Sequence, residues 1–397
     1  MRKDRGIVPF EEFVKRVGFS KIQCVKISKF LEESFMPFKV TEYYVKLIEN
    51  QEDPKIKQQL LNIILPPTTS KPFEGRFDPY GNIQTRQGKT PFLQHKYENT
   101  LLFHAVDVCF SNCQFCYKTR EIREEKTASK SNIDEKVSAA VQYLNLHPEI
   151  DNVLISGGDP AVFPNTKIIE IISKLLESKN VRMVRLATKS LAYNPQKLHD
   201  EIFLNFFQKI HSLSGKKVCI IAQYNHPSEI SFESIKTVKA LQKVGVQVYC
   251  QPVILRGVND DVNTLVELQN KFLDNNIQSY YLVSFMPVKG VTQYALPLEK
   301  VFQLIAKSKQ QLNGLAKKGM LILPHDWGKL EFCGFLPSLE NPKKIVLKWH
   351  EVAMDQYLPE SLIGTEHEDI LLLNFEQEKI YCLDDLFKYN DLSNINL

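Results

Sequence analysis

The sequence lacks any apolar run close to the ~20 residues that span a bilayer, so no membrane-spanning helix is expected. The charged start, Met1 to Arg5, is not followed by a continuous apolar segment with a small-residue cleavage site, so no secretory signal is expected. An excess of one charge is also missing, because 50 basic and 46 acidic residues leave a net charge of +4. This balance does not favour nucleic-acid binding. We predict a globular, cytoplasmic protein with neither a membrane nor a nucleic-acid partner.

The eight cysteines do not form the pattern of a disulfide framework, which is typical of small secreted chains. No second CxxC pair exists to complete a four-ligand zinc site. Five cysteines are scattered and are expected to be small buried hydrophobes. The other three fall within eight residues: Cys109, Cys113 and Cys116.

Short apolar segments alternate with longer amphipathic segments from about residue 100, whereas the first 95 residues have helical spacing with irregular connections. The predicted strands are Leu101–Val108, Asn152–Ser156, Val181–Ala187, Lys217–Gln223, Val246–Ile254, Ser279–Ser284 and a last strand Met320–Leu323. The predicted helices between them are Asp134–Leu146, Thr166–Leu176, 197–211, Ser231–Val244, Val262–Leu273 and Val301–Leu312. Such alternation predicts parallel strands with right-handed crossovers, closed as a barrel or left as an open sheet. In either case ligands bind at the carboxyl ends of the strands.

The cysteine segment, Cys109-Phe-Ser-Asn-Cys113-Gln-Phe-Cys116, comes directly after the first of these strands. Spacings of four and three residues let one loop bring three thiolates to one face of an iron–sulfur cubane. Three thiolates leave one iron without a protein ligand, whereas an all-cysteine cluster has four. A structural zinc site is the alternative, but the nearby His104 lies within the strand.

The CxxxCxxC spacing, with an aromatic residue (Phe115) before the last cysteine, resembles the radical SAM superfamily from about residue 100 to 325. The resemblance implies that Cys109, Cys113 and Cys116 ligate a [4Fe-4S] cluster. It also implies that S-adenosylmethionine (SAM) chelates the open iron and is cleaved to a 5′-deoxyadenosyl radical. The cofactors then supply the difficult chemistry and the protein positions them.

A second motif, Gly157-Gly158-Asp159-Pro160, ends the next predicted strand. Taken alone it is also ordinary turn chemistry. The superfamily resemblance implies that Gly157, Gly158 and Asp159 help to bind SAM, and that Gln223 and Gln251 add contacts from later strand ends.

The order of further segments resembles the lysine 2,3-aminomutase family over residues 35 to 330. These segments are Phe38-Lys-Val-Thr-Glu-Tyr-Tyr, Tyr224-Asn-His-Pro-Ser-Glu-Ile, Gln251-Pro-Val-Ile-Leu-Arg-Gly-Val-Asn-Asp-Asp261 and Ser279-Tyr-Tyr-Leu. That family also binds pyridoxal phosphate (PLP), on a lysine that closes a glycine-rich loop after the last core strand. The corresponding segment here is an expected loop, Pro324 to Lys329, with most of the glycines replaced. Lys329 is therefore the candidate PLP lysine, and a surface lysine in an irregular loop is the alternative.

Three departures from the family concern the substrate. The arginine that grips the carboxylate of free lysine corresponds to Lys118, which lacks a bidentate fork. The aspartate that receives the distant ammonium corresponds to Met286, and a buried ammonium without a partner is costly. The family's Arg-Tyr-x-x-Arg becomes Lys96-Tyr-Glu-Asn-Thr100. These changes favour an amino acid other than lysine.

We therefore predict an α/β fold, a partial (β/α)6 radical SAM barrel at residues 98–330. A helical N-terminal extension (1–97) precedes it and a small C-terminal extension (331–397) follows, in which Asp369–Asn374 and Lys379–Leu383 can form a hairpin. The expected partners are a small amino-acid-like substrate and a reductant such as flavodoxin or ferredoxin, and homo-oligomerisation is open. Two other functions stay open, a PLP-free radical SAM enzyme (dehydrogenation, epimerisation or peptide modification) and a non-catalytic iron–sulfur or zinc protein.

Overall fold

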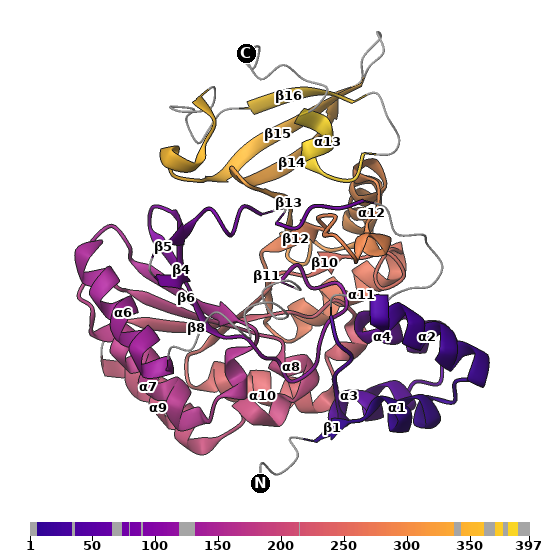
Figure 1. Cartoon of the computed structure of the whole chain (residues 1–397), viewed down its shortest axis with the longest axis horizontal. Coiled ribbons are helices and arrows are strands. Elements are labelled where there is room, and N and C mark those ends of the chain that lie inside the picture. The colour runs from indigo at the N-terminus through magenta and orange to yellow at the C-terminus, as the bar shows by residue number, and fades with distance from the viewer. Residues whose placement is uncertain are drawn as a thin grey trace.

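The computed structural model describes residues 6–33, 36–65, 74–78, 80–88, 90–118, 132–213, 215–336, 343–360, 370–375 and 380–387. Figure 1 shows parallel strands with helices on their outer side, the N-terminal helices packed beside them, and a C-terminal sheet that lies over the barrel. None of the helices in these ranges combines the length and apolar character needed to cross a bilayer.

A curved wall of parallel strands forms the barrel. Its strands are β5 (Thr100–Val106), β6 (Asn152–Gly157), β7 (Met183–Thr188), β8 (Lys217–Ala222), β9 (Gln247–Cys250), β10 (Val253–Ile254), β11 (Gln278–Ser279), β12 (Tyr281–Ser284) and β13 (Met320–His325). Each pairs in parallel with its neighbour in the wall, and Val153 on β6, for example, lies opposite Val184 on β7. The predicted α/β partial barrel is confirmed.

Helices follow the strands along the outside of the wall. They are α6 (Ile133–Leu146), α7 (Asn165–Glu177), α8 (Ser190–Tyr193), α9 (Glu201–Leu213), α10 (Phe232–Lys243), α11 (Val262–Asp274) and α12 (Leu298–Gln311). Polar caps fix where several of them begin, because a side-chain oxygen satisfies a free backbone N–H in the first turn. Ser231 accepts from the Ser234 backbone N–H (3.1 Å) and Asp261 from that of Thr264 (2.9 Å). Asn132 forms a capping box with Glu135 at the start of α6.

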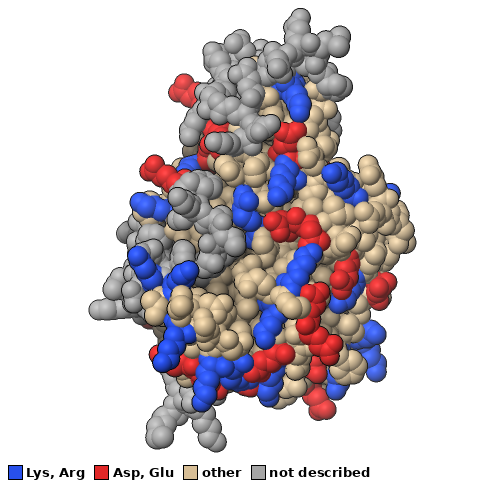
Figure 2. Space-filling view, turned by 90° about the vertical axis from the view of Figure 1, so that its right-hand side faces the viewer, with Lys and Arg blue, Asp and Glu red and all other residues tan. Residues whose placement is uncertain are grey.

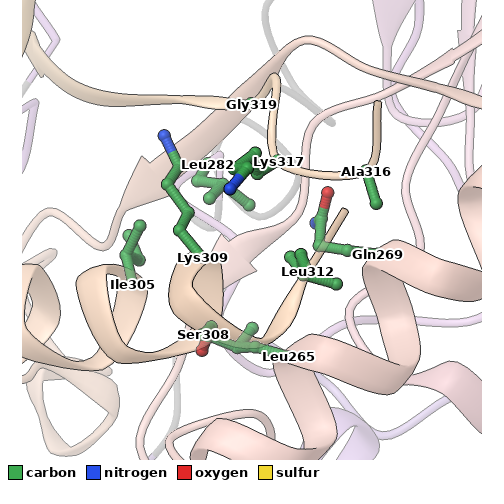
Figure 3. A pocket seen from close by; sticks show the side chains of 10 residues that line it. All are labelled: Leu265, Gln269, Leu282, Ile305, Ser308, Lys309, Leu312, Ala316, Lys317 and Gly319. Atoms are coloured by element: carbon green, nitrogen blue, oxygen red, sulfur yellow. The ribbon is translucent and has the colours of Figure 1, made fainter. Parts of the chain in front are cut away.

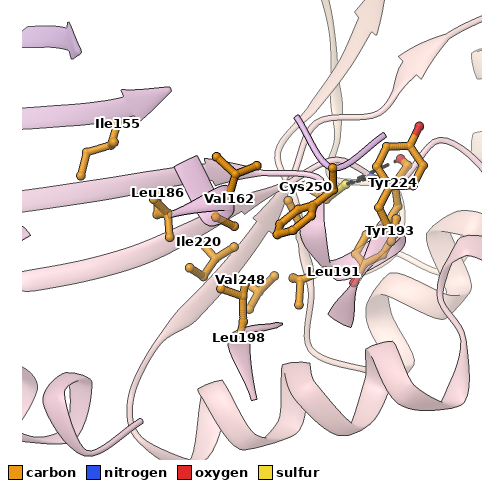
Figure 4. Close-up of a cluster of buried hydrophobic side chains, with 14 of the residues drawn as sticks. Ile155, Val162, Leu186, Leu191, Tyr193, Leu198, Ile220, Tyr224, Val248 and Cys250 are labelled. Carbon is orange, nitrogen blue, oxygen red and sulfur yellow. Dashed lines mark hydrogen bonds between the residues drawn. The ribbon is translucent and has the colours of Figure 1, made fainter. Parts of the chain in front are cut away.

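The main core lies between the strands and these helices. Figure 4 shows side chains from four consecutive strands turned to the same outer face of the wall, Ile155, Leu186, Ile220 and Val248. All four are at most 1% exposed. The alternate residues of the same strands must therefore face the interior of the barrel, which is where the candidate site lies.

Two predicted strands are each broken in two, which corrects the sequence analysis. Val246–Ile254 forms β9 and β10, and Ser279–Ser284 forms β11 and β12. Pro252 has no N–H for a ladder and lies at the first break. The wall changes sheets there, because β9 pairs with β8 and β11 whereas β10 pairs with β12.

The N-terminal extension is helical only in part. Its elements are β1 (Ile7–Val8), α1 (Phe10–Val17), α2 (Lys21–Glu33), β2 (Val40–Thr41), α3 (Glu42–Glu49), α4 (Pro54–Ile64), β3 (Arg86–Gln87) and β4 (Thr90–Tyr97). The antiparallel strands β3 and β4 extend the barrel wall beyond β5. The sequence analysis missed β4 because its second half buries three consecutive polar residues, Gln94, His95 and Lys96.

The C-terminal extension continues the wall as an antiparallel sheet. Its elements are β14 (Gly328–Leu336), β15 (Lys343–Val352), β16 (Ile370–Phe375) and α13 (Leu383–Phe387). A second apolar cluster joins Leu282 of the barrel to Leu330, Trp349 and Leu371 of this sheet. The three-part division of the chain stays a proposal, and its boundary at 330/331 falls within β14.

Two predictions for this region are wrong. Residues 324–329 are not a loop but a tight hairpin, in which Pro324 pairs with Lys329 across a turn at Asp326 and Trp327. Asp369 and Lys379 lie outside the described residues. The remainder of those two segments does not form a hairpin, because β16 pairs with β15 and residues 380–382 lead into α13. Buried Ile380 and Leu383 fix that segment instead in the second apolar cluster.

The remaining short elements are single 3-10 turns that connect strands to helices. They are η1 (Pro160–Val162), η2 (Pro195–Leu198), η3 (Pro227–Glu229), η4 (Thr292–Tyr294) and η5 (Asp355–Tyr357). Figure 2 shows basic and acidic side chains interspersed on one face of the molecule.

Candidate active site

The three clustered cysteines lie on an irregular loop at the carboxyl end of β5. None of them forms a disulfide. Within the loop the Cys116 backbone N–H donates to the Cys113 carbonyl (3.2 Å). Cys113 and Cys116 line the interior cavity of the barrel. The structure thus brings the predicted thiols to the end of the barrel where the parallel strands direct their ligands.

The N-terminal extension clamps this loop from one side. Lys39 donates from Nζ to the carbonyl of Cys109 (2.6 Å) and accepts from the Asn112 backbone N–H (2.9 Å). The Gln114 backbone N–H donates to the carbonyl of Ile63 (2.9 Å). These contacts give the extension a role in shaping the site, because the loop's own backbone groups are satisfied by residues of the extension.

The thiols are buried, and burial disfavours the charged form of a cysteine. Desolvation raises the pKa of Cys113 to about 12, against a smaller lowering effect of the Lys189 charge. Desolvation likewise raises the pKa of Cys109 well above its ordinary value. Such thiols become thiolates when a positive metal centre binds to them. The donor set fits a cluster with one open iron, because no fourth cysteine lines this cavity among the described residues.

The Gly157-Gly158 segment packs against the other side of the cysteine loop. Gly157 has φ of +112°, a conformation that glycine adopts readily. A side chain on Gly157 would collide with the carbonyl oxygen of Val106, and one on Gly158 would collide with that of Val108. Both glycines are therefore required by the close approach of β6 to the residues just before Cys109.

The Asp159 carboxylate is fully engaged by the chain itself. It accepts from the Ala161 backbone N–H (3.0 Å), the Thr188 hydroxyl (2.7 Å) and the Lys189 backbone N–H (3.0 Å). Burial raises the pKa of Asp159, and these hydrogen bonds act in the opposite direction. Asp159 thus joins the end of β6 to the end of β7. The contacts with SAM predicted for Gly157, Gly158 and Asp159 stay a proposal.

The cavity of about 280 Å³ that the cysteines enter occupies the barrel interior. Each of seven parallel strands contributes one inward residue to its wall: Leu102, Leu154, Arg185, Ile221, Val253, Val283 and Ile322. Six of these seven are apolar, which excludes water from the interior and strengthens electrostatic interactions there.

Arg185 is the exception, and the sequence analysis missed it. Its Nη2 donates to the Asn152 side chain (2.6 Å), whereas its buried Nε has no partner within the described residues. An unsatisfied guanidinium N–H in an apolar wall is a candidate for binding an anionic group. The signal available in the sequence was an arginine inside an otherwise apolar strand, Val184-Arg-Leu-Ala, because such strands are normally apolar on both faces.

Gln223 and Gln251 both line the cavity, at the ends of β8 and β9 as predicted from their sequence positions. Gln251 accepts from the Tyr280 hydroxyl through Oε1 (2.9 Å). The carbonyl of Gln223 accepts from Lys189 Nζ (2.9 Å), so the backbone at this point is held from behind. Their predicted contacts with SAM stay a proposal.

Lys329 also lines this cavity, from the start of β14. Its Nζ lies 4.8 Å from the centre of the Tyr97 ring and 5.5 Å from that of Tyr281. It forms an ion pair with Glu351 on β15. The sequence analysis missed Glu351, which lies beyond the barrel and is brought to the cavity only by the pairing of β14 with β15.

The hairpin that carries Lys329 is anchored at its turn. Arg76 pairs through Nη2 with Asp326 (2.6 Å) and through Nη1 with Asp384 (2.7 Å). Asp384 also accepts from His325 Nε2 (2.9 Å). The turn is thereby held between the N-terminal extension and α13, which fixes the direction of Lys329.

A second lysine, Lys96 on β4, borders the same cavity. Its ammonium donates to the carbonyls of Tyr80 (3.0 Å) and His325 (2.6 Å). Desolvation lowers the pKa of Lys96 to about 8, although nearby Asp326 acts in the opposite direction. Lys96 is therefore a second basic group that an anionic or electrophilic ligand can meet.

Lys118 and Met286, which the sequence analysis assigned to substrate recognition, do not border the cavity. Lys118 is 6% exposed and donates to the Ser156 hydroxyl (3.0 Å) and the Gly157 carbonyl (3.2 Å). It supports the glycine turn from behind. Met286 is buried, and its neighbours Val283 and Phe285 face the cavity instead.

A separate hollow lies between α11, α12 and the strands β12 and β13 (Figure 3). Leu265, Ile305 and Leu312 form much of its apolar wall. Its volume of about 10 Å³ is close to the minimum for one water molecule. We therefore take the central cavity as the candidate active site.

The comparison with known proteins agrees with this site. The sequence profile described as the radical SAM superfamily matches residues 105–268, which include the three cysteines and the glycine turn. A protein of Aquifex aeolicus with the name "Putative L-lysine 2,3-aminomutase" is 31% identical over 319 residues, which cover 80% of this chain and 81% of that protein. The chain belongs to the lysine 2,3-aminomutase family of radical SAM proteins. Family membership makes it a radical SAM enzyme and implies a [4Fe-4S] cluster and SAM.

Another relative in the lysine 2,3-aminomutase family is the "L-lysine 2,3-aminomutase" of Clostridium subterminale. It is 26% identical over 355 residues, which cover 87% of this chain and 80% of that protein. Among solved structures, a radical SAM methyltransferase from Sphaerobacter thermophilus aligns with a TM-score of 0.39 and 15% identity, over 58% of this chain and 67% of that chain. That likeness is too distant to bear on function.

Replacing Cys109, Cys113 or Cys116 by alanine should each remove the cluster, because two thiolates cannot hold it. We expect iron to fall from about four atoms per chain to nearly none after anaerobic reconstitution, with loss of the brown colour and of SAM cleavage. Cys219→Ala is the matched control, because Cys219 is buried outside the loop. A Cys113→Ala protein that kept four irons and cleaved SAM would exclude Cys113 as a ligand.

Gly158→Val should disrupt the cysteine loop as well as the glycine turn, because the new side chain must displace the carbonyl of Val108, the residue before Cys109. We expect iron content and SAM binding to fall together, with a loss of about 1–3 kcal/mol in the free energy of unfolding. Gly314→Val is the control, since no atom lies within 4 Å of a side chain built there. Normal iron content in Gly158→Val would contradict this account.

Proposed function

We propose that this enzyme catalyses an aminomutase-type rearrangement of an amino acid other than free lysine. The observation that carries the proposal is that Lys329 and two of the clustered cysteines open into one cavity. A radical generated at the cysteine loop and a substrate held at Lys329 would then share an enclosed space of about 280 Å³. Such proximity is what a radical transfer to substrate requires.

In this proposal Cys109, Cys113 and Cys116 hold the cluster, and Gly157, Gly158, Asp159, Gln223 and Gln251 form the surroundings of SAM. When bound and reduced, the cluster supplies the electron that cleaves SAM to a radical. The chain's own part is to orient the ligands and to exclude water. The apolar wall residues protect a radical from solvent, and the glycine turn holds the cysteine loop at a fixed distance from β6.

Lys329 is the residue that we propose to bind PLP, which would hold the substrate amino group covalently. The rings of Tyr97 and Tyr281 limit the movement of the Lys329 side chain, and Glu351 can accept its proton. Arg185 and Lys96 are the two cations that remain for the anionic groups of cofactor and substrate, namely a phosphate and a carboxylate. They take the place that the sequence analysis gave to Lys118.

The charge of the cavity supports a substrate without a distant ammonium. Glu351 is the one carboxylate among the described residues that border the cavity, and it is already paired with Lys329. A second ammonium would remain unpaired in a largely apolar interior, which is costly. Tyrosine side chains at the cavity, including Tyr80, Tyr117 and Tyr280, favour an uncharged or aromatic side chain in its place.

The remaining parts of the proposal concern the cell. Reduction of the cluster needs a one-electron donor such as flavodoxin or ferredoxin. Free thiols and an iron–sulfur cluster fit the cytoplasm, where thiols stay reduced. Homo-oligomerisation is open to measurement by light scattering.

Borohydride reduction of holoprotein loaded with PLP should fix the cofactor permanently to the peptide that contains Lys329. Lys329→Met should abolish this labelling and the visible absorbance of the cofactor, whereas Cys219→Ala should leave both unchanged. Labelling of Lys96 instead would assign the cofactor to β4 and remove Lys329 from the proposal. A protein that cleaves SAM but binds no PLP would be a PLP-free radical SAM enzyme.

Product analysis after anaerobic reconstitution should show turnover of an uncharged or aromatic amino acid at least about tenfold above that of free lysine, because one unpaired buried charge costs more than the 1.4 kcal/mol of a tenfold change. The panel should contain lysine and its uncharged isostere norleucine, so that only the distant ammonium differs. Faster turnover of lysine than of every uncharged amino acid would refute the substrate argument. Absence of SAM cleavage with a full cluster would refute the proposed function as a whole.

A further inference from the structure

Tyr193, the last residue of α8, places its hydroxyl 3.0 Å from Cys113 Sγ. The residue is 1% exposed. A phenol hydroxyl buried to this degree needs a hydrogen-bond partner. Within the described part of the chain, Cys113 is the partner that the Tyr193 hydroxyl has. Figure 4 shows Tyr193 among the buried side chains next to Leu191 and Tyr224.

The direction of this hydrogen bond is fixed once Cys113 ligates iron. A ligating thiolate carries no proton, so its sulfur can only accept, whereas the tyrosine hydroxyl can donate. The contact then becomes an O–H···S bond to a charged acceptor, a class that is stronger than a neutral hydrogen bond.

Tyr193 is held in place by its neighbours. Thr41 donates from its hydroxyl to the Tyr193 carbonyl (2.6 Å), and the Thr41 backbone N–H donates to the Ser111 hydroxyl in the cysteine loop (3.0 Å). The Tyr44 ring packs edge-on against the Tyr193 ring at 4.8 Å. One residue of the N-terminal extension therefore ties the phenol and the thiol to each other.

A buried ion pair lies behind Tyr193. Lys189 Nζ is 5.1 Å from the centre of the Tyr193 ring and 2.7 Å from a carboxylate oxygen of Glu229. Their side chains are 7% and 0% exposed. Glu229 also accepts from the Asn225 backbone N–H (2.6 Å) and the Tyr44 hydroxyl (3.2 Å). The Lys189 charge is thus neutralised and fixed, and the mobile proton nearest the Cys113 sulfur is that of Tyr193.

We infer that Tyr193 raises the reduction potential of the cluster through its hydrogen bond to Cys113. This inference rests on the proposed ligand role of Cys113. Reduction adds one electron, taken from a donor such as dithionite, and the added negative charge is shared by the sulfur ligands. A donor aimed at one of these sulfurs stabilises the reduced form more than the oxidised form, and hydrogen bonds to the sulfurs are among the features that set cluster potentials. Tyr193 acts through Cys113 and is a positioning and tuning residue.

The test is Tyr193→Phe, which removes one oxygen atom and keeps the ring. Tyr224→Phe is the matched control, because Tyr224 is fully buried in the same core and its hydroxyl bonds to Ser234 (2.5 Å) instead of a cysteine. The three proteins are reconstituted, their iron is counted, and the cluster is titrated with dithionite under EPR detection. We expect full iron in all three. At a fixed potential near the midpoint, the ratio of reduced to oxidised cluster should fall about tenfold in Tyr193→Phe only, which is about 59 mV for a one-electron couple.

Resonance Raman spectra give a second readout that does not depend on catalysis. The Fe–S(Cys) bands of the wild-type protein should shift in D2O, because the tyrosine proton exchanges, and this shift should be absent in Tyr193→Phe. Equal midpoint potentials of Tyr193→Phe and wild type, with iron content intact, would overturn the inference while the proposed function stands. A wild-type protein that assembles no cluster would instead contradict the proposed function itself. Should Tyr193→Phe lose iron, the D2O shift in the wild-type protein decides alone, and its absence overturns the inference.

Discussion

The structure depends on one constraint, which is that three thiols on an irregular loop must meet at one point. The loop makes one backbone hydrogen bond between its own cysteines, from Cys116 to Cys113. Neighbouring segments supply the remaining support. Lys39 and the backbone around it hold one side, and the turn at Gly157 and Gly158 packs against the other. The N-terminal extension and the end of β6 therefore belong to the site as much as the cysteines do.

The same arrangement divides the cavity by chemistry. Apolar residues from the parallel strands line its wall, and the charged groups are few: Arg185, Lys96, Lys329 and Glu351. In an interior of low polarity each of these charges acts over a longer distance than it would in water. Few charges in an apolar space can orient a substrate firmly and still leave no solvent near a reactive species. This explains why the recognition groups sit at separate points and are not clustered.

The sequence was sufficient to predict the barrel because each strand carries its own signal. Segments such as Asn152–Gly157 are short and apolar and are followed by an amphipathic helix, so local pattern and final structure agree. The cysteine spacing and the Gly157-Gly158 turn were also local. β4 was missed, because Gln94 and Lys96 are polar residues that become buried only through tertiary contacts. The hairpin at Asp326 was missed for a related reason, since Arg76 fixes its turn from 250 positions away in the chain.

The site residues followed the same rule. Cys109, Cys113 and Cys116 are neighbours in sequence, and they were predicted together. Glu351 and Tyr193 have no local signal, because strand pairing brings the first to Lys329 and Thr41 aligns the second with Cys113. Lys118 illustrates the opposite case. Its position in the motif suggested a ligand, but the nearby Ser156 hydroxyl and Gly157 carbonyl offered its ammonium hydrogen bonds inside the protein.

The position of Glu351 has a consequence for biosynthesis. A ribosome delivers the chain from its N-terminus, and the early part of a protein can begin to fold before the rest is made. The barrel strands up to β13 are complete about 25 residues before Glu351 is added, yet one side of the cavity is built by β14 and β15. A nascent chain thus exposes the radical-forming centre and Lys329 on an unfinished vessel, and the compartment becomes sealed only near the end of translation. Cofactor loading is accordingly a late, post-translational event in the life of this protein.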